Sequence, residues 1–320
     1  VAGTDDSRLV ATAGPRWVGT FDLGGPGLKE DIEGVKYERG ESRHSWQGRV
    51  YTSDDRGQSW THRVDFPFMH ARPFVAGSSV YVLGQAGDLM IIKSDDNGET
   101  WSEAVKLTEG EHWHQAPSNV HYANGCVYLV MEKRVRQECR GWNICENAPV
   151  LMRAPLDADL TQRDSWTFSS EFSFCDNVPD KELEWHGIPF FPAYYPDAVE
   201  ASPGRHCAPA GWLETNVVQF TDPNHYWHDP KSKTFHLWAR AHTGGTGYAA
   251  IAKAVEKGDE PGTGEIEVMF ETVPSGKKIL YVPCPGGQMK FHVLYDDETE
   301  LFWLLSTQAT DSMSRAETLP

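Results

Sequence analysis

The chain has 320 residues and a formal net charge of −17, with 29 basic and 46 acidic residues. This balance argues against a nucleic-acid partner, because phosphate binding needs a basic surface. The chain contains no run of about 18 apolar residues, so no membrane-spanning helix is predicted. A hydrophobic fraction of 39%, with 29 Gly and 20 Pro, favours one large all-β domain of short strands and many turns.

The first feature along the chain is a repeat at residues 53–60 and 94–101, where both segments follow the pattern S-x-D-x-G-x-[S/T]-W. Its central carboxylates, Asp55 and Asp96, are 41 residues apart, a period that suits one four-stranded sheet. Strand-like residues precede each copy, so each is predicted to be a hairpin turn. There the Asp accepts hydrogen bonds from the turn and the Gly adopts a positive φ. A degenerate third turn is expected at residues 164–166.

Four further segments repeat a strand, turn, strand rhythm without this motif. They are residues 72–83, 118–130, 216–238 and 290–305. With the partial first unit they predict about five four-stranded antiparallel blades of a single β-propeller domain spanning 1–320. The sequence ends just after a strand pair, which leads us to expect that C-terminal blades are missing and that six or seven exist in the intact protein. Residues 175–210, rich in Pro and aromatic side chains, are predicted to be a loop insertion over one face.

The six cysteines lack the C-x-x-C spacing of metal sites. Cys139 with Cys145, and Cys175 with Cys207, could form local disulfides in an exported protein. The alternative is that they are buried thiols.

Two pairs of residues at the start of predicted inner strands are candidates for a site in the central pocket. His70 and Arg72 are two apart, so on a regular strand both side chains face the same way, as an acid or base beside a carboxylate anchor. The alternative is a surface ion pair and a turn cap. His112 and His114 follow the same spacing, and could be catalytic imidazoles, weakly supported metal ligands or polar loop residues.

A later group of candidates surrounds Arg240, which lies in an apolar strand where a charge is costly unless it is paired. Arg240 is therefore expected to neutralise a buried carboxylate or to bind one carried by a substrate. His242 and Tyr248 flank the Gly-rich segment that follows, where backbone could approach a ligand. Tyr226 lies in a predicted turn and Gln288 in another, so a solvated turn is the leading interpretation of both.

The two motif copies at blade spacing resemble the Asp-box (BNR repeat) of the sialidase, or neuraminidase, superfamily of β-propellers. The resemblance implies a glycoside hydrolase of carbohydrate metabolism in which arginines bind the substrate carboxylate, a Tyr is the nucleophile and a Glu activates it. Glu214 and Tyr248 would take the last two roles. The superfamily's usual F/Y-R-I-P motif is not present; the nearest match, residues 70–74, follows the first box instead of preceding it. More distantly, the chain resembles the propeller uronate lyases and rhamnosidases, which use His, Tyr and Arg.

The leading hypothesis is therefore a secreted, periplasmic or cell-surface hydrolase of acidic oligo- or polysaccharides that needs no cofactor or metal. Its substrate-binding residues would be Arg72, Arg240, His242, Tyr226 and Gln288, and its acid, base and nucleophile would come from His70, His112, His114, Glu214 and Tyr248. The alternatives are a lyase or rhamnosidase on uronate-containing glycans, and a non-catalytic propeller that binds glycan or protein.

Overall fold

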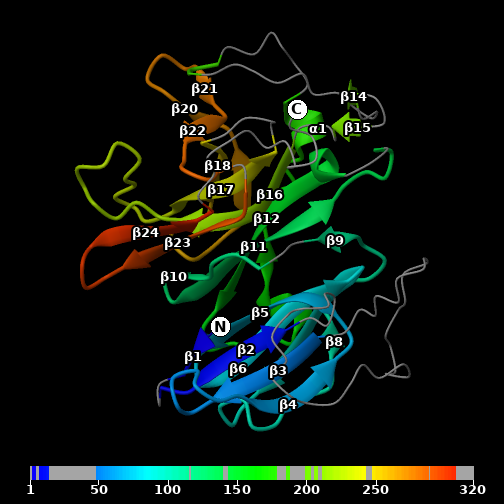
Figure 1. The fold of residues 1–320 in the computed structure, drawn as a ribbon. Helices are drawn as coiled ribbons and strands as arrows, with labels where there is room; N and C mark the ends of the chain where they lie inside the picture. Colours follow the sequence, from blue (N-terminus) through cyan, green and yellow to red (C-terminus); the bar gives the residue numbers. More distant parts are fainter. Residues whose placement is uncertain are drawn as a thin grey trace. The chain divides into compact units, whose positions relative to one another are not determined.

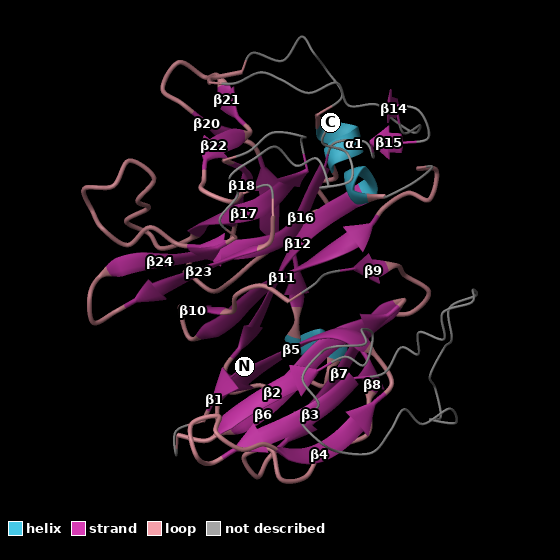
Figure 2. Ribbon diagram, in the orientation of Figure 1, coloured by secondary structure: helices cyan, strands magenta, loops and turns pink. Residues whose placement is uncertain are grey.

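The computed structural model describes residues 2–4, 7–13, 48–114, 117–139, 143–178, 185–187, 199–202, 205–207, 211–242, 247–287 and 289–307. The described chain is almost entirely β-structure, and successive strands pair antiparallel (Figures 1 and 2). Within the described residues, two sheets have four strands, two have five strands that include a four-strand path in chain order, and three are two-stranded. The predicted all-β class with four-stranded antiparallel blades is thereby confirmed. The chain divides into two compact units, residues 1–117 with 154–166 and residues 118–153 with 167–320.

The first unit contains two four-stranded sheets in simple chain order. One is formed by β1 (Ala2–Gly3), β2 (Leu9–Ala13), β3 (Gly48–Ser53) and β4 (Thr61–Phe66). The other is formed by β5 (Met69–Ala76), β6 (Ser79–Ala86), β7 (Asp88–Ser94) and β8 (Val105–Lys106). The unit also holds β9 (Trp113–His114) and the short helix η2 (Arg163–Ser165). Val10 and Val50 of one sheet pack with Val80, Val82 and Ile92 of the other in one buried core.

The second unit repeats this plan. Its first four-stranded path is β10 (His121–Ala123), β11 (Cys126–Arg134), β12 (Asn147–Pro155) and β13 (Thr167–Phe168). Its second is β16 (Gly211–Val218), β17 (Thr234–His242), β18 (Tyr248–Glu256) and β19 (Ile266–Met269), with β22 (Tyr281–Pro283) also paired to β18. The hairpin of β23 (Phe291–Asp296) and β24 (Leu301–Ser306) is the fifth predicted strand pair. Tyr128, Leu151, Trp212 and Phe235 belong to the buried core between the two larger sheets.

Smaller elements complete the second unit. They are η1 (Ile144–Glu146), α1 (Phe174–Asn177), β14 (Val199–Ser202) with β15 (Arg205–Cys207), and β20 (Glu271–Thr272) with β21 (Lys278–Ile279). Of the predicted insertion at 175–210, the greater part lies outside the described residues.

Both motif copies form turns between the third and fourth strands of separate sheets, as their spacing predicts. In the second copy the Asp96 carboxylate accepts the Thr100 backbone N–H at 2.9 Å and the Thr100 hydroxyl at 2.5 Å. The Trp101 indole N–H donates to the Gly98 carbonyl at 3.0 Å. The first copy repeats each of these bonds through Asp55, Ser59, Trp60 and Gly57. The carboxylate therefore replaces strand partners that the tight turn cannot supply.

The degenerate third turn lies where the pattern places it, between β12 and β13, but its details differ from the prediction. Asp164 is exposed and lies in η2. The hydrogen-bonding carboxylate is Asp159, which accepts the Thr161 hydroxyl at 2.9 Å and its N–H at 3.2 Å. Trp166 is buried, and its indole N–H donates to the Leu160 carbonyl.

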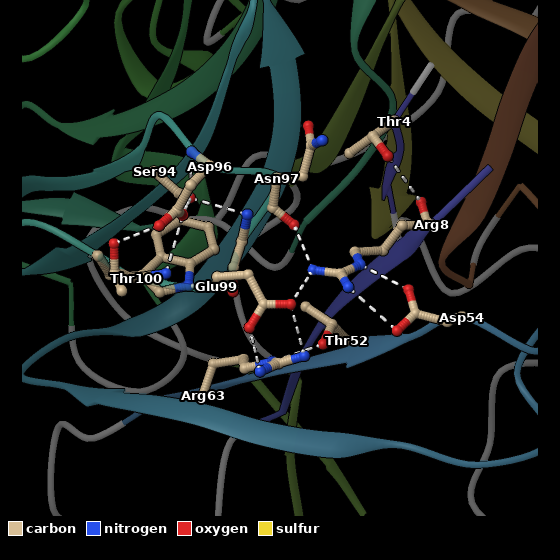
Figure 3. A network of polar contacts seen from close by, with 12 residues as sticks. Thr4, Arg8, Thr52, Asp54, Arg63, Ser94, Asp96, Asn97, Glu99 and Thr100 are labelled. Carbon is tan, nitrogen blue, oxygen red and sulfur yellow. Dashed lines mark hydrogen bonds and ion pairs between the residues drawn. The ribbon is translucent and has the colours of Figure 1, made fainter. Parts of the chain in front are cut away.

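A charged network joins the two turns of the first unit (Figure 3). The Arg8 guanidinium donates to the Asp54 carboxylate at 2.6 Å and to the Glu99 carboxylate at 2.5 Å, and so contacts both turns. Arg63 on β4 donates to Glu99 and, at 2.7 Å, to the Thr52 hydroxyl. Because each carboxylate faces a guanidinium, the network neutralises its own charges and fixes neighbouring sheets against one another.

Cys139, Cys145 and Cys175, the described cysteines of the two predicted disulfides, are free thiols. Cys145 and Cys175 are buried free thiols, and the Cys145 thiol is hydrogen-bonded to that of Cys139. Burial raises the pKa of both Cys145 and Cys175. Of the two alternatives set by the sequence, buried thiols describe these residues; the side chain of Cys207 lies outside the described set.

The turn carboxylates make stability depend on pH. Hydrogen bonds from the Ser59 and Thr100 side chains, with those of the turn N–H groups, lower the pKa of Asp55 and of Asp96 from 3.8 to about 2. A lowered folded-state pKa stabilises the fold above the unfolded value and ceases to do so as the pH falls towards about 2. We expect the double variant Asp55→Asn, Asp96→Asn to take up about 1.5 fewer protons on unfolding near pH 3 than the wild type. The slope of the urea-unfolding free energy against pH measures this difference.

A matched control is the double variant Asp164→Asn, Asp297→Asn, which changes two exposed carboxylates. We expect its slope of unfolding free energy against pH to stay close to that of the wild type. Equal slopes for the wild type and the Asp55, Asp96 variant would contradict the assignment.

Candidate active site

Two non-glycine residues have a positive φ inside strands. Eight described non-glycine residues have φ between 51° and 68°, and six of these lie in turns or loops between strands, where this conformation is common. The other two are His70 on β5, with φ 51°, and Glu214 on β16, with φ 57°. Such backbone costs about 1–2 kcal/mol in a residue with a Cβ, so the surrounding structure must impose it.

The same local irregularity produces both conformations. On β5 the paired residues shift from Met69↔Gln85 to Arg72↔Leu83, so that His70 and Ala71 oppose only Gly84. On β16 the shift runs from Leu213↔Arg240 to Asn216↔Trp238, so that Glu214 and Thr215 oppose only Ala239. Two residues opposite one define a β-bulge, which re-aims a side chain. A Cβ on Gly84 would lie 2.4 Å from the Met69 carbonyl oxygen, so the bulge on β5 requires glycine there.

In the second unit the bulge brings Glu214 to Arg240; we call Glu214 and Arg240 the Glu214 cluster. The Arg240 guanidinium lies 3.5 Å from the Glu214 carboxylate, and the two side chains are 14% and 9% exposed. The guanidinium also contacts the Met289 sulfur at 4.0 Å. Tyr248, half-buried at the start of β18, lies next along that strand to Ala249, the residue paired with Arg240. The expectation that Arg240 meets a carboxylate in its apolar strand is thus met by Glu214.

Side chains from neighbouring strands hold this bulge. The Thr215 backbone N–H and hydroxyl both donate to one oxygen of the buried Glu132 on β11, at 3.0 and 2.9 Å. The Asn216 amide accepts the Val293 N–H of β23 and donates to the Phe291 carbonyl. Asn119 does the same for Val217, accepting its N–H at 2.8 Å and donating to its carbonyl at 2.7 Å. Adjacent inner strands are therefore joined through side-chain amides.

In the first unit the bulge of β5 presents an imidazole; we call His70, Gln85 and His114 the His70 cluster. The His70 ring contacts His114 edge to face, with ring centroids 5.2 Å apart, and its Nδ1 lies 2.7 Å from the Gln85 amide nitrogen. Arg72 is 2% exposed on the same strand. The prediction that His70 and Arg72 face the same way assumed a regular strand, and the bulge at His70 and Ala71 interrupts that regular alternation.

The other predicted site residues are either exposed or have side chains outside the described set. His112 is exposed, and Tyr226 is 63% exposed in the segment between β16 and β17, as the solvated-turn interpretation expects. His242 ends β17 opposite Gly211, but its side chain lies outside the described set, as does the whole of Gln288.

Sequence reasoning missed Gln85, Glu132, Thr215 and Met289. Glu132 carried one signal: in the sequence it follows the apolar run 126–131, where an acidic residue has to be partnered. Among the residues with described positions, no group of three or more His, Cys, Asp or Glu side chains could hold a metal ion. None of the helices described is long and apolar enough to cross a membrane.

Comparison with known proteins gives structural likeness only. No family model matches the sequence, and no curated protein matches it significantly. A protein of unknown function from Dyadobacter fermentans is similar to 93% of this chain and 71% of its own, at 14% identity and a TM-score of 0.44. The α-L-arabinanase of Penicillium chrysogenum is similar over 81% of this chain and 67% of its own, at 12% identity and a TM-score of 0.36. The NanB sialidase of Streptococcus pneumoniae is similar over 62% of this chain and 24% of its own, at 14% identity and a TM-score of 0.33.

The strained backbone at residue 214 can be tested by comparing Gly and Ala, because both remove the side chain and only Gly adopts positive φ freely. We expect Glu214→Gly to be more stable to urea than Glu214→Ala by about 1 kcal/mol. Glu267, on the regular strand β19, is the matched control. There Gly should be less stable than Ala by about 0.5–1 kcal/mol. The same order of stability at both positions would contradict the assigned φ.

Proposed function

We propose that this chain is a carbohydrate-active enzyme, a glycoside hydrolase that acts on acidic sugars through the Glu214 cluster. The observation that supports this most is the Glu214 carboxylate, which strained backbone inside a strand holds 3.5 Å from a guanidinium. A protein core seldom retains such backbone unless the side chain that it aims has a function.

The chemistry assigns one role to each side chain. Arg240 binds the sugar carboxylate, because a guanidinium offers five N–H donors in a planar fork that matches a carboxylate. Tyr248 attacks the anomeric carbon, because a phenol avoids the repulsion between an anionic sugar and a carboxylate nucleophile. As the glycosidic bond breaks, Glu214 takes the phenol proton and the leaving oxygen takes a proton from solvent. When water then hydrolyses the glycosyl–tyrosine bond, Glu214 returns its proton to the tyrosinate and the proton of the water goes to solvent.

The charge of the whole chain makes this arginine informative. A net charge of −17 repels an anionic ligand, so binding depends on local cations inside a site. Arg240 lies between the buried Ala239 and Ala241 and is only 14% exposed, where its attraction is screened less than at the surface. We further propose that the protein is exported and meets an acidic oligo- or polysaccharide outside the cytoplasm, without a cofactor.

Hydrolysis is tested with 4-methylumbelliferyl glycosides of N-acetylneuraminic acid and of uronic acids, whose aryl group leaves without a proton donor. We expect release of the fluorophore, a loss of about 10²-fold or more in kcat/KM for Glu214→Gln and Arg240→Met, and little change for the exposed Glu267→Gln. Calorimetric binding of the same glycosides without turnover would instead indicate a non-catalytic propeller. If the protein neither binds nor hydrolyses any of these glycosides, the proposal is refuted.

A second candidate, a uronate lyase, is favoured by the His70 cluster. Two imidazoles whose ring centroids are 5.2 Å apart could serve as the base that removes the proton α to a uronate carboxylate and the acid that protonates the leaving oxygen. Arg72, on the same strand as His70, would neutralise the carboxylate and so acidify that proton.

Elimination creates an unsaturated uronate that absorbs in the ultraviolet, whereas hydrolysis does not. For a lyase we expect this absorbance to rise when the protein is mixed with uronate polysaccharides. The rate of the rise should be about 10²-fold or more lower in His70→Gln and in His114→Gln. The exposed His112→Gln is the matched control and should retain the rate. New reducing ends without absorbance would exclude the lyase.

A further inference from the structure

The bulge on β16 creates a donor that the sheet cannot satisfy. Regular pairing with β17 stops at Leu213 and resumes at Asn216, so the Thr215 N–H has no place in it. Thr215 is fully buried, and an unpaired buried N–H is costly. One oxygen of Glu132 accepts both this N–H and the Thr215 hydroxyl.

That contact bears directly on Glu214. Without an acceptor for the Thr215 N–H, β16 would lower its energy by regaining regular pairing with β17. Side chains alternate with period two along a strand, so losing the extra residue would turn Glu214 away from its present side. The acceptor on β11 therefore selects the bulged conformation, and the bulge selects the position of the Glu214 carboxylate.

We propose that Glu132 is a positioning residue of the candidate active site, acting through Thr215 to hold Glu214 in its strained conformation beside Arg240. Its catalytic consequence rests on the proposed function, whereas its conformational consequence does not. Two variants retain the interaction: Glu132→Gln keeps the oxygen acceptor and Thr215→Ser keeps the hydroxyl. Glu132→Leu removes the acceptor of both bonds, whereas Thr215→Val removes the hydroxyl bond, with little change of shape, and leaves the N–H bond in place.

The first test uses stability alone. Glu214→Gly and Glu214→Ala are compared by urea unfolding in each of these four backgrounds and in the wild type. We expect Gly to be favoured over Ala by about fivefold in the unfolding equilibrium constant in the wild type, Glu132→Gln and Thr215→Ser. In Glu132→Leu the preference should disappear or reverse, and in Thr215→Val it should shrink. If Glu132→Leu does not fold, Glu132→Met, which has nearly the shape of Glu but no oxygen acceptor, decides; an undiminished Gly preference there overturns the proposal.

The second test uses turnover of the acidic aryl glycosides by chains that retain Glu214. Misplacing a base lowers the chemical step more than substrate binding, so we expect Thr215→Val to lower kcat about tenfold with KM within about twofold, and Thr215→Ser to restore kcat. Unchanged kcat in both Thr215→Val and Glu132→Met overturns the catalytic part. If no variant, nor the wild type, turns over any glycoside while the Gly preference responds as expected, the proposed function fails and the positioning role stands.

Discussion

Backbone groups that the strand pairing leaves over have to find partners, and this constraint shapes the chain from its turns to its candidate site. In the turns the partners are the carboxylates of Asp55 and Asp96. Between inner strands they are the amides of Asn119 and Asn216. At the bulge of β16 the partner is Glu132. Each of these polar side chains is placed where regular hydrogen bonding stops, because an orphaned buried group costs more than an ordinary hydrogen bond contributes.

The bulges connect this constraint to function. A regular strand sends alternate side chains to opposite faces and offers no way to aim one residue differently. An extra residue does so on β5 of the first unit, at His70, and on β16 of the second unit, at Glu214. One bulge presents an imidazole beside a second imidazole, and the other presents a carboxylate beside a guanidinium. The same backbone device thus presents two different pairs of ionisable side chains.

The sequence anticipated much of the fold because its signals are local. The hydrogen bonds of the Ser94–Trp101 turn join residues a few positions apart, so the motif determines them wherever the hairpin lies. Alternating apolar runs around 216–238 and 290–305 likewise gave the paired strands β16–β17 and β23–β24. The third turn was placed correctly but its carboxylate was not, since Asp159 and Asp164 are equally plausible until one of them faces a turn N–H.

By itself, the sequence determined the all-β class, the spacing of the turns and the cost of a charge at Arg240 in an apolar strand. Only the tertiary structure decided which carboxylate meets Arg240, because Glu214 lies 26 positions away and reaches it through a bulge that no periodic pattern announces. It also decided that Glu132 partners Thr215, 83 positions along the chain. Hairpin turns depend on neighbours in sequence, whereas bulges and their partners depend on which strands pack together, and that choice is made by the core.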